Sequence, residues 1–174
     1  DIFISGGDSS QAEASLDYVN QNEMLMTNYA SASPLLSIEE DQLLRLGPND
    51  AIQGKVIAKA LQSKGFDAVV IMHRDDEFAS SLYGVIESEF VQLGGETPIQ
   101  VPYPVDIEVQ DWSPYLGQAD ANLVTLRQTY GSSNVGFVVI SFGEIVPILL
   151  EAPNYNTLYS TSWIGCDTTT LSGN

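Results

Sequence analysis

Two short segments of the chain are continuously apolar: residues 68–72, which read AVVIM, and residues 135–140, which read VGFVVI. Strands that are buried on both faces of a parallel sheet have this composition, whereas half-exposed strands alternate apolar and polar residues. A segment with helical spacing of apolar residues precedes each of them, at 51–64 and at 112–130. The two segments therefore predict central strands of a parallel sheet that is covered by helices.

The same alternation of strand and helix continues outward in both directions. Further strands are expected at 2–4, 24–26, 43–46, 99–103 and 158–164, and further helices at 11–20, 78–93 and 144–151. Within the helix at 51–64, Val56, Ile57, Ala60 and Leu61 are expected to face inward. Repeated strand–helix units predict an α/β fold, a parallel-sheet βαβ sandwich with right-handed crossovers.

Ligands of such sheets bind beyond the carboxyl ends of the strands. The segments to search for function are therefore Gly6–Ser10, Ala30–Pro34, His73–Phe78, Ser141–Glu144 and Cys166–Thr168. Residues 165–174 are expected to form a polar loop.

The charge of the chain excludes some partners. The formal net charge is −17, from 23 acidic and 6 basic residues. Such a surface repels nucleic acid and anionic lipid, so neither is expected as a partner. The acidic surface is interpreted as a solvated face that favours solubility or suits a salty habitat; the alternative is recruitment of cationic ligands.

The ends and the cysteine content indicate the context of the chain. No apolar run is long enough to span a membrane, and the first residues, DIFIS, resemble a strand inside a fold rather than a signal peptide. We therefore expect the natural N-terminus to lie upstream. Cys166 is the one cysteine, so an internal disulfide is excluded.

Motifs for catalysis or for metal binding are missing. Cys166 and His73 are the one cysteine–histidine pair, and no family signature surrounds Cys166. The acids Asp75, Asp76 and Glu77 are interpreted as helix capping rather than as a metal site. We expect no enzyme activity, no cofactor and no metal, with a hydrolase that uses Cys166 or a serine kept as a distant alternative.

One succession of motifs resembles a known family. Between Leu44 and Gly95 the chain carries Arg45-Leu46-Gly47-Pro48-Asn49-Asp50, Gln53-Gly54, Gly65-Phe66, Asp75-Asp76-Glu77-Phe78 and Leu93-Gly94-Gly95. In this order the motifs resemble the type I periplasmic binding proteins of the branched-chain amino-acid class, the receptors of ABC transporters. The resemblance implies two α/β lobes, a hinge, and a small ligand in the cleft between the lobes.

The resemblance also implies the residues that bind the ligand: Asp8, Ser10, Ala30, Ala32, Phe78, Phe142 and Asp167. The hydroxyl of Ser10 and the backbone at Asp8, Ala30 and Ala32 correspond to groups that hold the ligand carboxylate. Phe78 and Phe142 stand where tyrosines are usual, and Asp167 corresponds to the acid that receives the ligand ammonium. Because Phe78 and Phe142 lack the tyrosine hydroxyl, a pocket with fewer hydroxyls and a more apolar or aromatic ligand is expected. Gly7 replaces a usual proline, and Ala32 replaces a usual threonine whose hydroxyl helps to hold the carboxylate in the family.

Position by position, residues 1–46 match the C-terminal part of the first lobe and residues 47–174 an incomplete second lobe. The chain thus resembles a fragment, and we expect the unpaired strand edges of its first part to be covered by rearrangement or by a second copy in a homodimer. The implied function is an extracytoplasmic receptor that captures a small molecule, an amino acid or amide, for the membrane permease of an ABC transporter. The alternative is a sensory or regulatory ligand-binding domain of the same fold.

Overall fold

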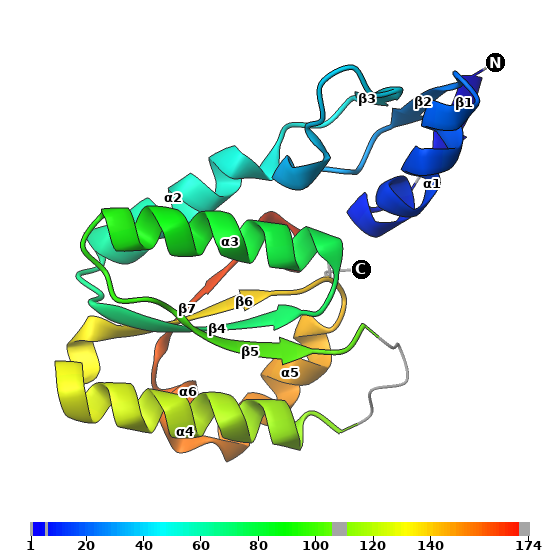
Figure 1. Cartoon of the computed structure of the whole chain (residues 1–174). Helices are drawn as coiled ribbons and strands as arrows, with labels where there is room; N and C mark the ends of the chain where they lie inside the picture. The colour runs from blue at the N-terminus through cyan, green and yellow to red at the C-terminus, as the bar shows by residue number, and fades with distance from the viewer. Residues whose placement is uncertain (1, 6, 106–110, 171–174) are drawn as a thin grey trace.

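The computed structural model describes residues 2–5, 7–105 and 111–170, which form two parallel sheets (Figure 1). The first sheet has the order β1-β2-β3, with β1 at Ile2–Ser5, β2 at Leu25–Asn28 and β3 at Leu43–Arg45. Helix α1 (Ser9–Gln21) packs on it through an apolar face of Ala12, Leu16 and Val19. We call residues 2–45 the N-terminal unit.

The second sheet has the order β5-β4-β6-β7, and every pairing is parallel. Its strands are β4 (Ala68–Arg74), β5 (Ile99–Tyr103), β6 (Val135–Ile140) and β7 (Ser162–Gly165). The central strands β4 and β6 are the two apolar segments, and residues 68–73 and 135–140 are all buried. The predicted α/β fold with a doubly covered parallel sheet is confirmed.

Helices cover both faces of this second sheet, as Figure 1 shows. Helices α2 (Asp50–Ser63) and α3 (Glu77–Gln92) lie on one face. Helices α4 (Ser113–Tyr130), α5 (Ile145–Glu151) and α6 (Asn156–Tyr159) lie on the other. Alternate strand residues supply the two cores, because Ile71 and Val138 face α2 and α3 whereas Met72 and Val139 face α4. We call residues 50–170 the C-terminal unit.

The strand predicted at 158–164 is wrong in its first half. Residues 156–159 form α6, and β7 begins only at Ser162. Leu158 is buried in the core beside α4, and its N–H donates to Asp120 at 2.7 Å. A short apolar run does not distinguish a strand from one turn of helix, so this contact with α4 could not be read from the sequence.

Two smaller predictions also need correction. Val56 was expected to face inward but is 60% exposed, because Gly54 occupies the side of α2 that meets α3. The polar loop expected at 165–174 contains a 3-10 helix at Asp167–Thr170. Its residues 171–174, like Gly6 of the first predicted ligand loop, lie outside the described residues.

Candidate functional site

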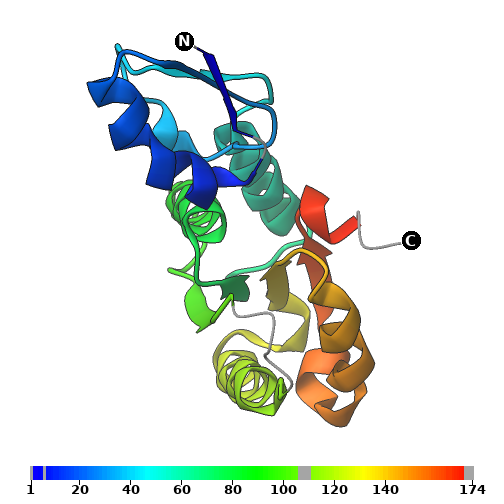
Figure 2. The same cartoon turned by 90° about the vertical axis from the view of Figure 1, so that its right-hand side faces the viewer.

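The N-terminal unit lies beside the starts of α2 and α3, on the side of the second sheet that these helices cover (Figure 1), and Figure 2 views the molecule from the end toward which the strands of the second sheet point. Hydrogen bonds join the two units there. Ser33 donates its hydroxyl to Oε1 of Glu77 at 2.6 Å, at the first residue of α3. The N–H of Asp50, at the first residue of α2, donates to the carbonyl of Ala32 at 2.8 Å. The loop after β2 is therefore tied to the starts of both helices on one face of the second sheet.

Buried polar side chains fix the shape of this loop. Oδ1 of Asn28 accepts the N–H groups of Ala30 and Ser31 at 2.8 and 2.6 Å, a turn that an asparagine after a strand favours. The hydroxyl of Ser9 in α1 accepts the N–H of Ser33 at 3.2 Å. In this arrangement the Ala30 N–H, which was expected to donate to a ligand carboxylate, donates to Asn28 within the turn. Ser9 was considered only as part of the segment Gly6–Ser10, and Asn28 was not singled out, although an asparagine two residues before a small-residue loop was a usable signal.

A pocket of about 360 Å³ opens where this loop meets the C-terminal unit. It is lined by Tyr29, Ala30, Ala32, Gly47, Pro48, Asn49, Asp50, Ile52, Gln53 and Asp167. Three of the residues predicted to bind ligand, Ala30, Ala32 and Asp167, are thus brought together from two units. Two acidic side chains, Asp50 and Asp167, line it, and we call it the two-aspartate pocket.

Asp50 is the unexpected residue of this pocket. It is 5% exposed, and its Oδ2 has no hydrogen-bond partner within the part of the chain that the structure describes. The pKa of Asp50 is raised to about 6, chiefly by burial and also by the negative charge of Asp167, while the positive charge of Arg45 lowers it. From the sequence Asp50 was noted only as part of a family motif, because an acid at a helix start usually has a capping role.

Asp167 has a structural contact of its own. It is exposed at the start of the 3-10 helix that follows β7, and its Oδ1 accepts the N–H of Thr168 at 2.7 Å. The carboxylate therefore shapes its loop and lines the two-aspartate pocket at the same time.

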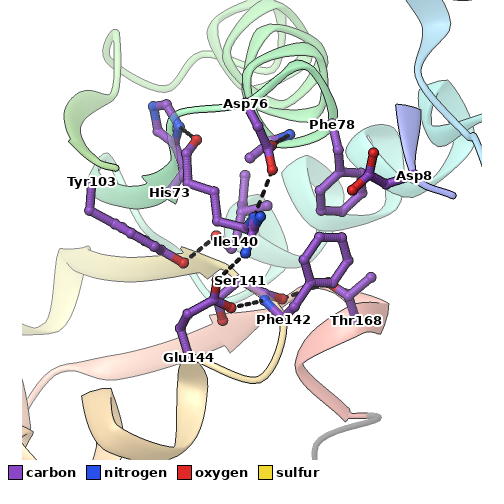
Figure 3. Close-up of polar contacts among 12 residues, drawn as sticks. Asp8, His73, Asp76, Phe78, Tyr103, Ile140, Ser141, Phe142, Glu144 and Thr168 are labelled. Atoms are coloured by element: carbon purple, nitrogen blue, oxygen red, sulfur yellow. Dashed lines mark hydrogen bonds and ion pairs between the residues drawn. The ribbon is translucent and has the colours of Figure 1, made fainter. Parts of the chain in front are cut away.

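Phe78 and Phe142 form a stacked aromatic pair, with ring centroids 5.1 Å apart and planes inclined by 19°. Phe78 begins α3 after β4, and Phe142 follows β6, so neighbouring strands place the two rings together (Figure 3). The guanidinium of Arg74 lies 4.5 Å from the centre of the Phe142 ring, within reach of a cation–π contact.

Arg74 also ties the two loops together through the carboxylates of Asp76 and Glu144, which Figure 3 labels. Its Nε donates to Asp76 at 2.7 Å, and its Nη1 donates to Oε1 of Glu144. Glu144 in turn accepts the N–H of Phe142 at 3.0 Å, and Asp76 caps α3 by accepting the N–H of Ala79 at 2.9 Å. The prediction that the acids at 75–77 cap a helix is confirmed for Asp76.

Asp8 and Ser10 belong to the start of α1. Oδ1 of Asp8 accepts the N–H of Gln11 at 3.0 Å, so Asp8 is the N-cap of α1. Ser10 is half-buried in the first turn. Neither residue lines the two-aspartate pocket, and nor do Phe78 and Phe142. The predicted site residues thus fall into the pocket, the aromatic pair and the α1 start.

The structure separates the cysteine and the histidine that a catalytic dyad would need together. His73 stacks on Tyr83 with centroids 5.3 Å apart and contacts Oε1 of Gln100 at 3.3 Å. The thiol of Cys166 is buried 3.8 Å from the carbonyl oxygen of Ser141. Among the residues that are described, no group of three acids, histidines or cysteines could hold a metal ion.

Comparison with known families identifies the fold. The family model described as "Receptor family ligand binding region" matches residues 1–172. The chain belongs to this family. This receptor family, of the type I periplasmic binding protein kind, is named for binding and not for catalysis, and the resemblance found in the sequence is confirmed.

Solved structures share the fold of this receptor chain at low sequence identity. A leucine-binding protein of Thermotoga maritima has a TM-score of 0.71 and 20% identity over 93% of this chain and 43% of its own. An ABC transporter substrate-binding protein of Desulfitobacterium hafniense, in complex with Leu, has a TM-score of 0.63 and 19% identity over 93% of this chain and 45% of its own. An extracellular ligand-binding receptor of Desulfohalobium retbaense has a TM-score of 0.72 and 17% identity over 93% of this chain and 26% of its own.

A curated relative, an uncharacterized protein of Methanocaldococcus jannaschii, is 23% identical over 97% of this chain. The receptor chain spans 40% of the length of that relative. Within residues 2–5, 7–105 and 111–170, no helix is long and apolar enough to cross a membrane.

Proposed function

We propose that the chain is the ligand-binding part of an extracytoplasmic solute receptor that captures a small amino-acid-like molecule for an ABC transporter. The observation that carries the proposal is the two-aspartate pocket, in which the loop after β2 meets the start of α2 and the loop after β7. Pockets at the carboxyl ends of parallel strands are the usual ligand sites of open α/β folds. The family supports a receptor, and neighbours described as leucine-binding or bound to Leu support an amino-acid ligand.

In this proposal the two units are the two sides of a cleft. Residues 1–46 are the C-terminal part of the first lobe and residues 47–174 most of the second, with the hinge at the segment between β3 and α2. Closure of the cleft around the ligand would create the surface that a membrane permease recognises.

Each end of the ligand has a proposed partner. Asp167 receives the ammonium, because a carboxylate makes strong hydrogen bonds to N–H donors. A carboxylate or amide oxygen would meet the start of α1, at the Ser10 hydroxyl and the backbone at Asp8, where helix N–H groups favour anions. The loop backbone at Ala30 and Ala32 would line the ligand within the pocket, and the stacked rings of Phe78 and Phe142, which lie outside the pocket, would form a further wall of the cleft.

Thermal unfolding with a panel of amino acids, their amides and small organic anions tests this function. A ligand at about 100 times its dissociation constant should add about 2.7 kcal/mol of apparent stability. We expect at least one amine-bearing compound to raise the unfolding temperature of the 174-residue chain, and Asp167→Ala to remove that shift. No shift with any amine-bearing compound would contradict an amino-acid receptor.

A further inference from the structure

We propose that the two-aspartate pocket selects a ligand of net positive charge, an amine or an amino amide without a free carboxylate, and that Asp50 and Asp167 together accept its ammonium. The inference rests on the proposed function, because it names the ligand class of the same site. It adds Asp50 as a second acceptor, deep in the pocket, and it disfavours the neutral zwitterion that the family neighbours bind.

The charged side chains that line the pocket favour a cationic ligand. Two acidic side chains line it, and among the described residues no lysine or arginine does. Arg45, the base whose charge acts on Asp50, is directed to the loop: its Nη1 donates to the Ser33 carbonyl at 2.5 Å and its Nη2 donates to the Ser37 hydroxyl. A zwitterion offers these acids one ammonium but also brings a carboxylate that they repel.

Two buried acceptor atoms of the pocket lack a hydrogen-bond donor in the described structure, which favours a ligand that donates hydrogen bonds. Oδ2 of Asp50 and Oε1 of Gln53 are both buried without a hydrogen-bond partner in the described structure, and both residues line the pocket. A buried acceptor without a donor is costly, so native structures usually supply one from the protein, a water or a ligand. An ammonium group has three N–H donors and no acceptor, which matches a pocket that presents Asp50, Asp167 and Gln53.

The missing hydroxyl at position 32 and the overall charge agree with this pattern. Ala32 has no side-chain donor for a ligand carboxylate, and its carbonyl already accepts the N–H of Asp50. The net charge of −17 would attract cations toward the chain and repel anions. The alternative noted from composition, recruitment of cationic ligands, thus gains a specific site.

Three probes that share the leucine side chain test the inference by titration calorimetry on the 174-residue chain at pH 7.5: L-leucine, L-leucinamide and 3-methylbutylamine. The first is a zwitterion, and the other two are ammonium ions without a carboxylate. We expect the natural chain to bind both amines about 10-fold or more tighter than leucine, as charge-assisted hydrogen bonds predict. Asp50→Asn should weaken both amines about 10-fold while changing leucine binding less.

Two further variants make the test decisive. Asp17→Asn removes the same charge from the exposed side of α1 and should leave all three affinities within about 2-fold, because a distant exposed charge is screened. Asp167→Asn alters an exposed side chain and should weaken the amines as Asp50→Asn does, so the result does not depend on how well the buried variant folds.

The outcomes separate this inference from the proposed function. If leucine binds more tightly than the amines, and Asp50→Asn changes neither affinity, the proposal of a cationic ligand is wrong. The proposal of an amino-acid receptor would then still hold. Equal loss for all three probes on Asp50→Asn would assign Asp50 a structural role and also overturn the proposal of a cationic ligand. No binding of any probe would contradict both proposals.

Discussion

Asp50 holds its carboxyl group in the two-aspartate pocket with little access to water, and that position has a consequence for stability. Its pKa rises from 3.8 unfolded to about 6 folded, so the folded state holds this proton more tightly. Stability from this group is therefore greatest below about pH 4 and is lost as the pH rises through about 6. Two pH units correspond to about 3 kcal/mol.

We therefore expect Asp50→Asn to unfold with about 3 kcal/mol more free energy than the natural chain at pH 7.5, and with about the same free energy at pH 4. Urea unfolding at pH 4, 5, 6 and 7.5 measures the difference, with Asp17→Asn as a control for net charge. A difference between the variants that stays constant with pH would contradict the raised pKa. A side chain that lowers stability at neutral pH is typical of a binding site rather than of a core.

Arg74 makes the opposite contribution at the aromatic pair. It is 12% exposed at its side chain and pairs with Asp76 and Glu144, which are also largely buried. Its removal leaves two carboxylates without their cation, and breaking a buried pair in this way costs about 3 kcal/mol or more. We expect Arg74→Ala to lower the unfolding free energy by about that amount. The ring of Phe142 should also become more exposed to solvent, which NMR measures.

The matched control for Arg74 is Lys55→Ala. Lys55 pairs with Glu89 at 3.2 Å but is 55% exposed, so its loss should cost less than about 1 kcal/mol. Similar losses for the two variants would show that the Arg74 contacts are no stronger than those at the surface.

At the residue scale the sequence predicted the site unevenly. Asp167, Ala30 and Ala32 came from the family resemblance, and the structure places them in one pocket. Asp50 could not be identified as a candidate site residue from its position at a helix start. Its pocket is formed with Asp167, more than a hundred positions along the chain, and with the loop after β2. Side-chain burial that depends on such distant segments has no local signature.

At the scale of the elements, α2 and α3 pack closely because α2 carries a glycine at their contact. A Cβ at Gly54 would lie 2.5 Å from Cγ1 of Val85, whereas a Cβ at Gly84 in α3 would meet nothing within 4 Å. Both glycines lie inside helices, where alanine is intrinsically more favourable by about 1 kcal/mol. The two positions therefore share the propensity gain and differ in packing.

We expect Gly84→Ala to raise the unfolding free energy by about 0.5–1 kcal/mol. Gly54→Ala should lower it by about 1–2 kcal/mol, because overpacking costs more than the propensity gain. Thermal unfolding of the two variants at one pH measures both. A stabilising Gly54→Ala would mean that Val85 moves aside at no cost and that the contact of α2 with α3 is loose.

The elements themselves were predictable to the extent that their patterns were local. The strands at 99–103 and 135–140 have the bounds expected from the sequence, because Pro98 and Pro104 flank the first and the second is continuously apolar. The strand predicted at 158–164 does not have the observed bounds, because α6 places Leu158 beside α4 and β7 begins only at Ser162. A continuously buried strand is therefore predictable from its apolar sequence, whereas a change from helix to strand within one apolar run is not.

The two units of the molecule differ in the size of their hydrophobic cores. The C-terminal unit has two large cores on either side of its sheet, whereas the N-terminal unit has one small core of Ala12, Leu16, Val19, Met26 and Leu36. Its three-stranded sheet has β1 and β3 as edges, and Ile2 and Leu44 on them are exposed. Open edges with apolar side chains favour pairing with another chain, so the homodimer expected from the sequence stays a prediction.

Hydrogen exchange measured by mass spectrometry at several protein concentrations tests both properties. Amides of β4 and β6 should exchange only by global unfolding, and those of β1, β2 and β3 about 10-fold or more faster, because a small core opens locally. If a second copy covers the edges, protection at β1 and β3 should rise with concentration while that at β4 and β6 stays constant. Equal protection in both units would mean that they unfold together, and protection independent of concentration would argue against the dimer.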